Sequence, residues 1–416
     1  MKVGILGQGF SGIFLALFLK EKNPKIDVTI IDKEETPGRK VLATGNGRCN
    51  ITNMAMSDKA YNCEDAANIV NDFNAEDIVK FLNSLGIFTR TYNNLVYPYS
   101  NSAKTFLDFL VARCKERKVK FVNRERIVDY TLENGKIRVK TQNKIFIFDK
   151  FVFACGNAAA PQLGGSDQIF TLLEKKGYKV APLRVGLAPI QTEEKPVTIQ
   201  NERVKATVSL YIDKVLSYQE NGEVLFKKDG LSGIAIFNCA SVVARSKRFK
   251  KCTISLDLMP EYDCDRLVEL LSKLNGESKA SVLSGLFTKH VAEYVRKASG
   301  IKNLYAYTPT EIKKLAVTLK NLVFTYKATY DFKDAQVAVG GVEFSNIAFD
   351  LESKKEPGIY FAGEVLNADG LCGGYNISFA IASAHKVAES LLEAEENVWI
   401  GLKASYKKWK WLRKFS

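Results

Sequence analysis

The first chemically informative residues are three glycines spaced as G-x-G-x-x-G, at Gly7, Gly9 and Gly12. They follow a short apolar run and open a segment with helical periodicity. Gly7 permits a tight turn, Gly9 lets a pyrophosphate approach the backbone, and Gly12 lets helix and strand pack closely. The free N–H groups and positive dipole of a helix start attract phosphate. With Phe10 and Ser11 inside it, the motif predicts a dinucleotide-binding turn.

An acidic residue stands where this kind of turn needs one. Asp32 ends the next apolar, β-branched stretch, twenty residues beyond Gly12. A carboxylate there accepts hydrogen bonds from the ribose hydroxyls of an adenosine and disfavours a 2′-phosphate. Strand, glycine turn, helix, strand and acid together predict an adenylate site, and they leave open whether the cofactor is NAD or FAD.

A second glycine-rich region, near the other end of the chain, indicates which of these two cofactors is bound. Gly363 and Glu364 follow a buried apolar stretch, and glycines recur over residues 369–376 before a helical segment. FAD is longer than NAD, so it threads past the first fold and needs amides or an acid at its ribityl chain and second phosphate. The backbone amides around Gly373 and Gly374 suit the pyrimidine edge of a flavin. The sequence therefore predicts FAD.

Longer motifs link these two regions. They are G-R-K at residues 38–40 followed by T-G-N-G-R-C-N-I-T-N at 44–53, G-L-S-G at 230–233, A-Q-V at 335–337 with G-G-V at 340–342, and the closing glycine block. By these motifs the chain resembles the single-FAD oxidoreductases that include aminoacetone-oxidase-like proteins and dehydro-bile-acid reductases, within the glutathione-reductase-like FAD superfamily. Two positions depart from the pattern: Cys155 replaces the usual threonine of Ala-Thr-Gly, and Ile234 replaces a proline.

The resemblance implies an α/β protein with a discontinuous, βββαα-like Rossmann-type FAD-binding domain and an inserted β-barrel domain that carries a small helical insert. The expected bounds are residues 1–183 and 335–416 for the first domain, 184–334 for the second, and about 260–320 for the insert. The expected cofactor-binding residues are Gly7, Gly9, Phe10, Ser11, Gly12, Asp32, Lys33, Gly38, Arg39, Lys40, Thr44, Gly45, Asn46, Arg48, Cys49, Asn50, Ile127, Ala154, Cys155, Gly156, Gly363, Glu364, Gly373, Gly374, Tyr375, Asn376 and Ile377. Arg39, Lys40 and Arg48 suit pyrophosphate or an anionic reduced flavin.

Cys49 is the most obvious candidate for direct chemistry, because a thiol beside a flavin suggests disulfide exchange. No second cysteine lies near it in sequence, and a redox pair needs a resolving thiol, so a structural or flavin-adjacent thiol is favoured. Tyr92, Tyr97, Tyr99 and Tyr375 serve equally well as proton donors, pocket walls or packing residues. The sequence identifies no catalytic acid or base.

Composition excludes several other classes. Eight scattered cysteines and only two histidines argue against a zinc site, an iron–sulfur cluster, a disulfide framework and a Ser-His-Asp hydrolase. Without a leader or an apolar span, a cytoplasmic protein is expected. The net charge of +14 would attract nucleic acid or anionic membranes, but the lysines are spread along the chain, so no specific nucleic acid is expected. Residues 399–416, basic and rich in tryptophan, are the exception.

The leading interpretation is an enzyme in which NAD(P)H delivers hydride to FAD, which then reduces a small, partly apolar acceptor such as a conjugated ketone. Only one glycine fingerprint is present, so the nicotinamide would visit the flavin transiently. One alternative is an oxidase of a small amine that uses dioxygen. Another, of a different class, is a flavoprotein associated with RNA or a membrane surface through its basic tail.

Alternating strand and helix patterns must position these residues. Apolar periodicity predicts strands at 2–6, 27–31, 151–155 and 359–362, with helices at 11–22, 66–85, 103–118 and 377–392. Residues 33–53 are expected to form a polar loop, and short strands to fill 121–148. The second domain is expected to contain strands at 185–191, 204–213 and 223–226, and helices at 265–274, 287–297 and 311–319.

Overall fold

The computed structural model describes residues 1–246, 248–275, 282–303 and 306–412, with side chains as far as residue 395. The chain divides into two compact units. The first consists of Met1–Leu183 and Ala338–Ser416, and the second is Arg184–Val337. A two-stranded sheet of β11 (Val180–Gly186) and β18 (Val337–Val342) lies where the chain passes between the units.

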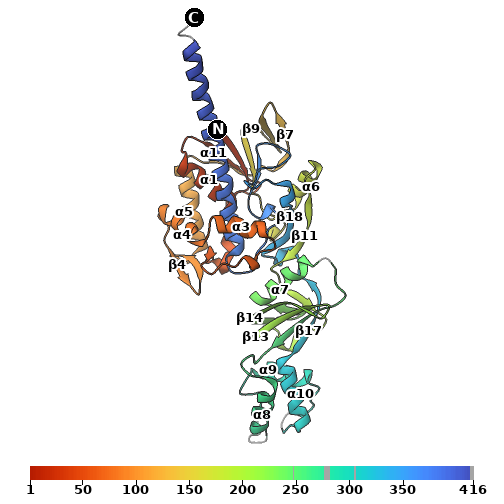
Figure 1. The fold of residues 1–416 in the computed structure, drawn as a ribbon. Helices are drawn as coiled ribbons and strands as arrows, with labels where there is room; N and C mark the ends of the chain where they lie inside the picture. Colours follow the sequence, from red (N-terminus) through yellow and green to blue (C-terminus); the bar gives the residue numbers. More distant parts are fainter. Residues whose placement is uncertain (247, 276–281, 304–305, 413–416) are drawn as a thin grey trace. The chain divides into compact units, whose positions relative to one another are not determined.

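A parallel five-stranded sheet forms the centre of the first unit. Its order is β19 (Ile359–Phe361), β10 (Lys150–Phe153), β1 (Lys2–Leu6), β2 (Asp27–Ile31) and β6 (Lys120–Val122). The central strands are almost continuously apolar, as expected for a sheet covered on both faces. Helix α1 (Phe10–Lys22) is buried from Phe10 to Lys20 and packs against α11 (Tyr375–Leu412), beside which it lies in Figure 1.

Shorter elements surround this sheet. They are α2 (Arg39–Ala43), β3 (Thr52–Asn53), α3 (Glu64–Asp72), α4 (Ala75–Ser84), β4 (Thr89–Tyr92), β5 (Leu95–Pro98), α5 (Ala103–Glu116), β7 (Ile127–Glu133), β8 (Lys136–Thr141), β9 (Ile145–Phe148) and α6 (Gln168–Lys175). Strands β3, β5 and β4 form one antiparallel sheet, and β7, β8 and β9 another. Both sheets belong to the first unit.

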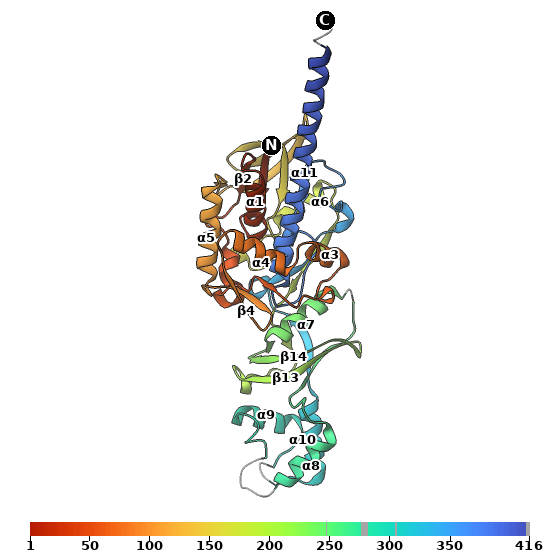
Figure 2. The same cartoon turned by 60° about the vertical axis from the view of Figure 1, so that its left-hand side comes forward.

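The second unit is built around a closed barrel. Its strands run in the order β12 (Ile190–Thr192), β15 (Gly230–Ser232), β14 (Val215–Lys227), β13 (Arg203–Ile212), β16 (Cys252–Asp257) and β17 (Leu322–Thr329). Helices α8 (Cys264–Leu274), α9 (Lys289–Ala298) and α10 (Pro309–Lys320) gather at one end of the barrel in both views (Figures 1 and 2). Each begins at a side-chain cap, since Asp263, Thr288 and Thr308 accept from the N–H three residues on.

The predicted fold class, an α/β protein with a Rossmann-type domain and a β-barrel, is confirmed. Several local predictions differ from the structure. The helix expected at 66–85 is divided into α3 and α4, because Asn74 caps the start of the second helix. The loop over residues 33–53 contains α2, a 3₁₀ turn at Thr44–Gly47 and β3. The strand expected at 185–191 is divided between β11 and β12. Helix α7 (Ile234–Arg245) was not predicted, because it is buried on most sides and its small residues give no clear polar face.

The C-terminal helix is longer than predicted, since α11 continues to Leu412. The interpretation of residues 399–416 as a basic aromatic face concerns side chains outside the described part of the chain. Among the residues that the structure describes, no helix combines the length and the apolar character needed to cross a membrane.

Candidate functional site

The loops that follow four parallel strands meet at one edge of the central sheet, because parallel strands end on the same side. They contain the glycine motif after β1, Asp32 after β2, Ala154 after β10 and Gly363 after β19. Gly7 has φ 111°, and a Cβ there would lie 2.3 Å from the Ala154 carbonyl oxygen. A Cβ on Gly12 would lie 1.9 Å from the Gly7 oxygen. These two glycines permit the close backbone packing that forms the turn.

Gly9 has a different environment. No described atom lies within 4 Å of the Cβ that a side chain would add there. Gly9 is also the N-cap of α1, and no side chain caps this helix. The neighbouring Gln8 is buried, and its Oε1 has no hydrogen-bond partner among the described atoms. An open cradle, free helix donors and an unsatisfied acceptor fit the adenosine diphosphate part of FAD.

Asp32 is held beside this cradle by backbone donors. Its Oδ2 accepts from the Gln8 N–H at 2.8 Å and its Oδ1 from the Glu34 N–H at 2.8 Å. Loss of water by burial raises the pKa of the Asp32 carboxyl, and the two N–H bonds partly oppose that shift. Lys33 follows Asp32 directly. The Glu125 N–H donates to the Asp32 carbonyl oxygen at 2.9 Å, and this bond brings the chain near Ile127, the first residue of β7, toward the same edge. A carboxylate that has lost its water here would be stabilised by hydrogen bonds from ribose hydroxyl groups.

The G-R-K segment is tied to both halves of the site. The Gly38 N–H donates to the Gln8 oxygen at 3.0 Å. Arg39 pairs with Glu34 and donates to the Gln162 oxygen at 2.7 Å. Lys40 Nζ lies 2.6 Å from Glu364 Oε2. Two of the three cations expected to meet pyrophosphate or an anionic flavin, Arg39 and Lys40, are therefore bonded to carboxylates of the protein in this structure.

The C-terminal segment packs directly on the N-terminal turn. A Cβ on Gly363 would lie 2.0 Å from Ser11 Oγ, and the Gly363 N–H donates to Ser383 Oγ at 2.9 Å. Asn157 Nδ2 donates to the Glu364 carbonyl oxygen at 3.3 Å, and a Cβ on Gly156 would lie 3.9 Å from Glu364 Oε2. Residues from the first and last parts of the chain thus form one site, and Ala154 and Cys155 lead into it.

The loop that contains Asn46 also meets the closing glycine block. Asn53 Nδ2 donates to the Gly373 oxygen at 3.2 Å, and Thr52 Oγ1 lies 2.7 Å from Ser378 Oγ, 326 residues away in sequence. With its amide oxygen turned toward Gly374, Asn50 accepts from the Gly374 N–H at 3.2 Å and donates to the Thr52 oxygen at 3.1 Å. Asn376 lies at the start of α11, where its Oδ1 accepts from the Gly370 N–H at 2.8 Å and its Nδ2 donates to the Gly370 carbonyl oxygen at 2.9 Å. Ile377 is the next residue of the helix.

The exposed part of this loop shapes the surface beside that contact. Gly45 and Asn46 both adopt left-handed backbone conformations, at φ 56° and 54°, after the partly buried Thr44. Residues 45–48 are exposed, whereas Cys49 is fully buried. The loop therefore exposes the backbone and polar side chains of residues 45–48 and buries the thiol of Cys49.

No described residue of the site stands out as a catalytic acid or base. Burial raises the pKa of Cys49 to about 12, against a smaller lowering by Thr44, so this side chain is a neutral thiol near pH 7. Burial likewise raises the pKa of Cys155 to about 12. The Tyr375 ring packs edge-on against Tyr61, whose hydroxyl donates to the Tyr375 oxygen at 3.0 Å.

Sequence reasoning did not identify Gln8, Glu34 or Asn157 as site residues. Gln8 occupies a variable position of the glycine motif, and the other two belong to no motif. A polar residue directly after Gly156, at a strand end that carries other site residues, was the available indication for Asn157.

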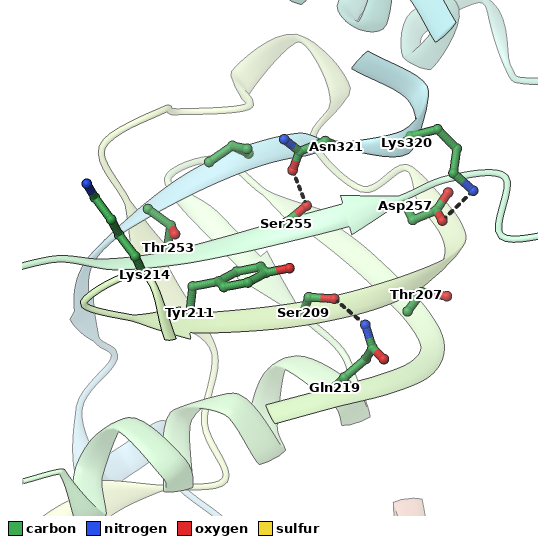
Figure 3. A pocket seen from close by; sticks show the side chains of 11 residues that line it. Thr207, Ser209, Tyr211, Lys214, Gln219, Thr253, Ser255, Asp257, Lys320 and Asn321 are labelled. Carbon is green, nitrogen blue, oxygen red and sulfur yellow. Dashed lines mark hydrogen bonds and ion pairs between the residues drawn. The ribbon is translucent and has the colours of Figure 1, made fainter. Parts of the chain in front are cut away.

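A polar cavity of about 510 Å³ lies on the barrel (Figure 3). Its side chains largely bond one another: Gln219 Nε2 donates to Ser209 Oγ at 2.8 Å, and Lys320 pairs with Asp257 at 2.6 Å. None of the predicted cofactor-binding residues lines it. The glycine-rich edge of the first unit is therefore the candidate site.

Three comparisons relate the chain to known proteins. Residues 1–390 match the family described as HI0933-like protein Rossmann domain. The 3-dehydro-bile acid delta(4,6)-reductase of Clostridium scindens is 28% identical over 94% of this chain and 99% of its own length. The ribosomal RNA dihydrouridine synthase of Escherichia coli is also 28% identical, over 94% and 98%. In fold, the chain is similar to the 3-ketosteroid delta1-dehydrogenase of Sterolibacterium denitrificans, with a TM-score of 0.51, 10% identity, and coverage of 94% and 99%.

Proposed function

We propose a specific reaction for this chain, which belongs to the HI0933-like protein Rossmann family and is an FAD-dependent oxidoreductase. It saturates a carbon–carbon double bond conjugated to a carbonyl group, with electrons supplied by NADH or NADPH. The acceptor gains a hydride at the carbon β to the carbonyl and a proton at the α carbon, while the nicotinamide is oxidised. When bound, FAD carries the two electrons between donor and acceptor.

One observation carries this proposal: the two named relatives share a chemistry. A delta(4,6)-reductase of a 3-dehydro-bile acid acts, by its name, on ring double bonds conjugated to an oxo group. A dihydrouridine synthase saturates the double bond of uracil, which is conjugated to a ring carbonyl. The bile acid and the RNA have little else in common, so the conjugated double bond is the part that this chain is expected to share.

The residues of the glycine-rich edge supply what this reaction needs from the protein. The open cradle at Gly9, with Asp32 beside it, would hold the adenosine diphosphate end of FAD. Short polar and glycine residues around Asn50 and Gly374 would leave the ring face open, and the bonds of Asn50 to Gly374 and Thr52 would hold these two segments together beside it. Cys49 takes no part, because its thiol is buried and protonated.

Uracil within RNA is the second candidate acceptor. The net charge of +14 suits a phosphate-bearing substrate, and a small apolar enone needs no such charge. The Escherichia coli relative adds a named precedent at 28% identity. Exposed tyrosine and arginine side chains beside the flavin-site segments of the first unit also favour RNA.

Anaerobic stopped-flow spectroscopy tests the proposed reaction. NADH or NADPH should bleach the flavin absorbance, and a conjugated enone or a uridine-containing RNA should restore it and appear with two added hydrogens. A saturated ketone should restore nothing. If aminoacetone or another small amine bleaches the flavin and only dioxygen restores it, the protein is an amine oxidase and the proposal is wrong.

A further inference from the structure

An aromatic and basic surface lies beside the flavin-site segments of the first unit. It consists of Arg48, Arg90, Tyr92, Tyr97 and Tyr99, and is called here the tyrosine–arginine face. Tyr92 is 70% exposed and Tyr99 is 63% exposed, although folding normally buries much of a tyrosine ring. The chemical step proposed above needs none of these five side chains, although Arg48 is among the residues expected to bind the cofactor.

Strand pairing places most of this surface on one side of a sheet. In the β4–β5 hairpin, Arg90 is opposite Tyr97 and Tyr92 is opposite Leu95, so these four side chains share one face. The alternate residues Val96 and Pro98 are buried, so the opposite face of β5 packs into the protein. The tyrosine–arginine face is thus the outer surface of the β3-β5-β4 sheet.

Arginine and tyrosine are already paired on this face. The Arg48 guanidinium lies 5.4 Å from the centre of the Tyr97 ring, and that of Arg90 lies 4.2 Å from the Tyr99 ring. Arg90 also donates to the Tyr99 oxygen at 2.6 Å, which holds it in place. Planar rings and planar guanidinium groups of this kind are the surfaces on which unpaired bases stack.

The charge of the same segments is all positive. Residues 38–53 contain Arg39, Lys40 and Arg48, residues 86–102 contain Arg90, and neither stretch contains an aspartate or glutamate. Because Arg39 and Lys40 pair with Glu34 and Glu364, the positive charge that this surface offers to a ligand is that of Arg48 and Arg90. This charge attracts a polyanion and gives no advantage to a neutral steroid-like acceptor. A polyanion with flat, apolar rings therefore complements this face in both charge and shape.

The face is continuous with the segments expected around the flavin. Asn53 of β3 pairs with Leu95, so its side chain lies on the same side of the sheet, and its Nδ2 donates to the Gly373 oxygen at 3.2 Å. A Cβ on Gly45 would lie 3.7 Å from the Tyr97 ring. A chain bound along the tyrosine–arginine face would therefore reach both glycine segments of the site.

We propose that the tyrosine–arginine face binds an unpaired segment of RNA, stacks its bases on the tyrosine rings, contacts its phosphates through Arg48 and Arg90, and presents a uracil to the flavin site. Only the final reduction of the uracil rests on the reaction proposed above. Binding itself needs no reductant and no turnover.

Fluorescence anisotropy of the full-length, FAD-loaded protein tests the proposal, with a short, unstructured, uridine-rich, labelled RNA as the probe. This RNA should bind more tightly than a duplex of equal length. Tyr92→Ala and Arg90→Ala should each weaken binding about tenfold, the change expected when one stacked base or charged contact is lost. Arg90→Ala should also reduce the slope of log affinity against log salt by about 0.7. FAD content and thermal melting of each variant show that it is folded.

Two matched variants serve as controls. Phe349→Ala removes another aromatic side chain of the first unit, one that is 80% exposed, and Arg266→Ala removes an exposed arginine of α8. Each should change RNA affinity by less than about twofold, the range of ordinary surface substitutions. Equal loss in control and hairpin variants, equal affinity for the duplex, or no binding at all would overturn the proposal. So would binding of anionic vesicles but not RNA. RNA binding without reduction of any double bond would instead overturn the proposed reaction alone.

Discussion

At the scale of single residues, the glycines of one motif have two separate tasks. A Cβ on Gly12 would meet the Gly7 oxygen, so this glycine is required for packing, whereas Gly9 borders open space in which we propose that the cofactor binds. Their equal prominence in the sequence hides this difference, because a spacing pattern does not say what a missing side chain makes room for. An alanine substitution should therefore weaken cofactor binding at Gly9 and lower the stability of the fold at Gly12.

Gly9→Ala should leave the fold intact and weaken FAD binding at least tenfold, because its methyl group would occupy the space through which the pyrophosphate approaches. Gly12→Ala should lower the free energy of unfolding by about 1–3 kcal/mol or more, because its methyl group has no room. Urea unfolding of the apoprotein and quenching of FAD fluorescence measure the two quantities. A destabilised Gly9→Ala protein, or one with unchanged FAD affinity, would contradict this division of roles.

Cys49 should be chemically silent in the folded protein. With its pKa raised to about 12, only about one thiol in ten thousand is ionised at pH 8, and the side chain is fully buried. Iodoacetamide should therefore label Cys49 only after unfolding, as peptide mass spectrometry would reveal, and Cys49→Ser should keep most of its turnover. Rapid labelling in the native state would show that the thiol is reactive.

At the scale of elements, the parallel strands and the turns after them were predictable, because a short apolar run that ends in glycine or an acid is typical of a buried strand. The first helix begins one residue earlier than predicted, and β2 matches its predicted bounds. Helix α7 could not be predicted, because it is buried on most sides and therefore lacks the polar face that identifies an amphipathic helix in a sequence. Ile234, which departs from the proline expected from the family resemblance, is its first residue, a position that does not require proline.

The contact between the β3 segment and the closing glycine block depends on hydrogen bonds that no local pattern could reveal. Thr52 and Ser378 are fully buried, and Ser378 Oγ also donates to the Gly374 oxygen at 2.9 Å. Neither hydroxyl belongs to a periodic motif. A sequence shows that both residues are polar, but it does not show that they satisfy each other.

Ser378→Ala should cost about 1–3 kcal/mol of unfolding free energy, because it leaves the Thr52 hydroxyl buried without its partner. Adding Thr52→Val should recover part of that loss, which a double-mutant cycle in urea would measure as coupling. Ser84→Ala, at an exposed serine bonded to its own helix, is the control and should change stability little. Strictly additive losses would mean that the two hydroxyls do not depend on each other.

At the scale of the whole molecule, the first unit is assembled from the two ends of the chain, and the barrel unit is inserted between them. The family resemblance predicts a discontinuous first domain with an inserted β-barrel domain. A cofactor bound at the glycine-rich edge would connect the two ends, because its site draws on residues near Gly9 and near Gly363.

FAD should therefore protect one unit selectively. At a concentration one hundred times the dissociation constant, it adds about 2.7 kcal/mol to the stability of whatever it binds. Hydrogen exchange with mass spectrometry should show slower exchange in peptides from α1, β2 and β19, and little change in β13 and β14 of the barrel. Equal protection in both units would mean that the cofactor site is not confined to the first.

Identification of the released cofactor tests the central claim most directly. The purified protein, denatured by heat, should release FAD at one molecule per chain, as chromatography and mass spectrometry would establish. We expect this result because the open space at Gly9 and the carboxylate of Asp32 suit an adenosine diphosphate group. Release of FMN, or a colourless protein that cannot be reconstituted with FAD, would contradict the account.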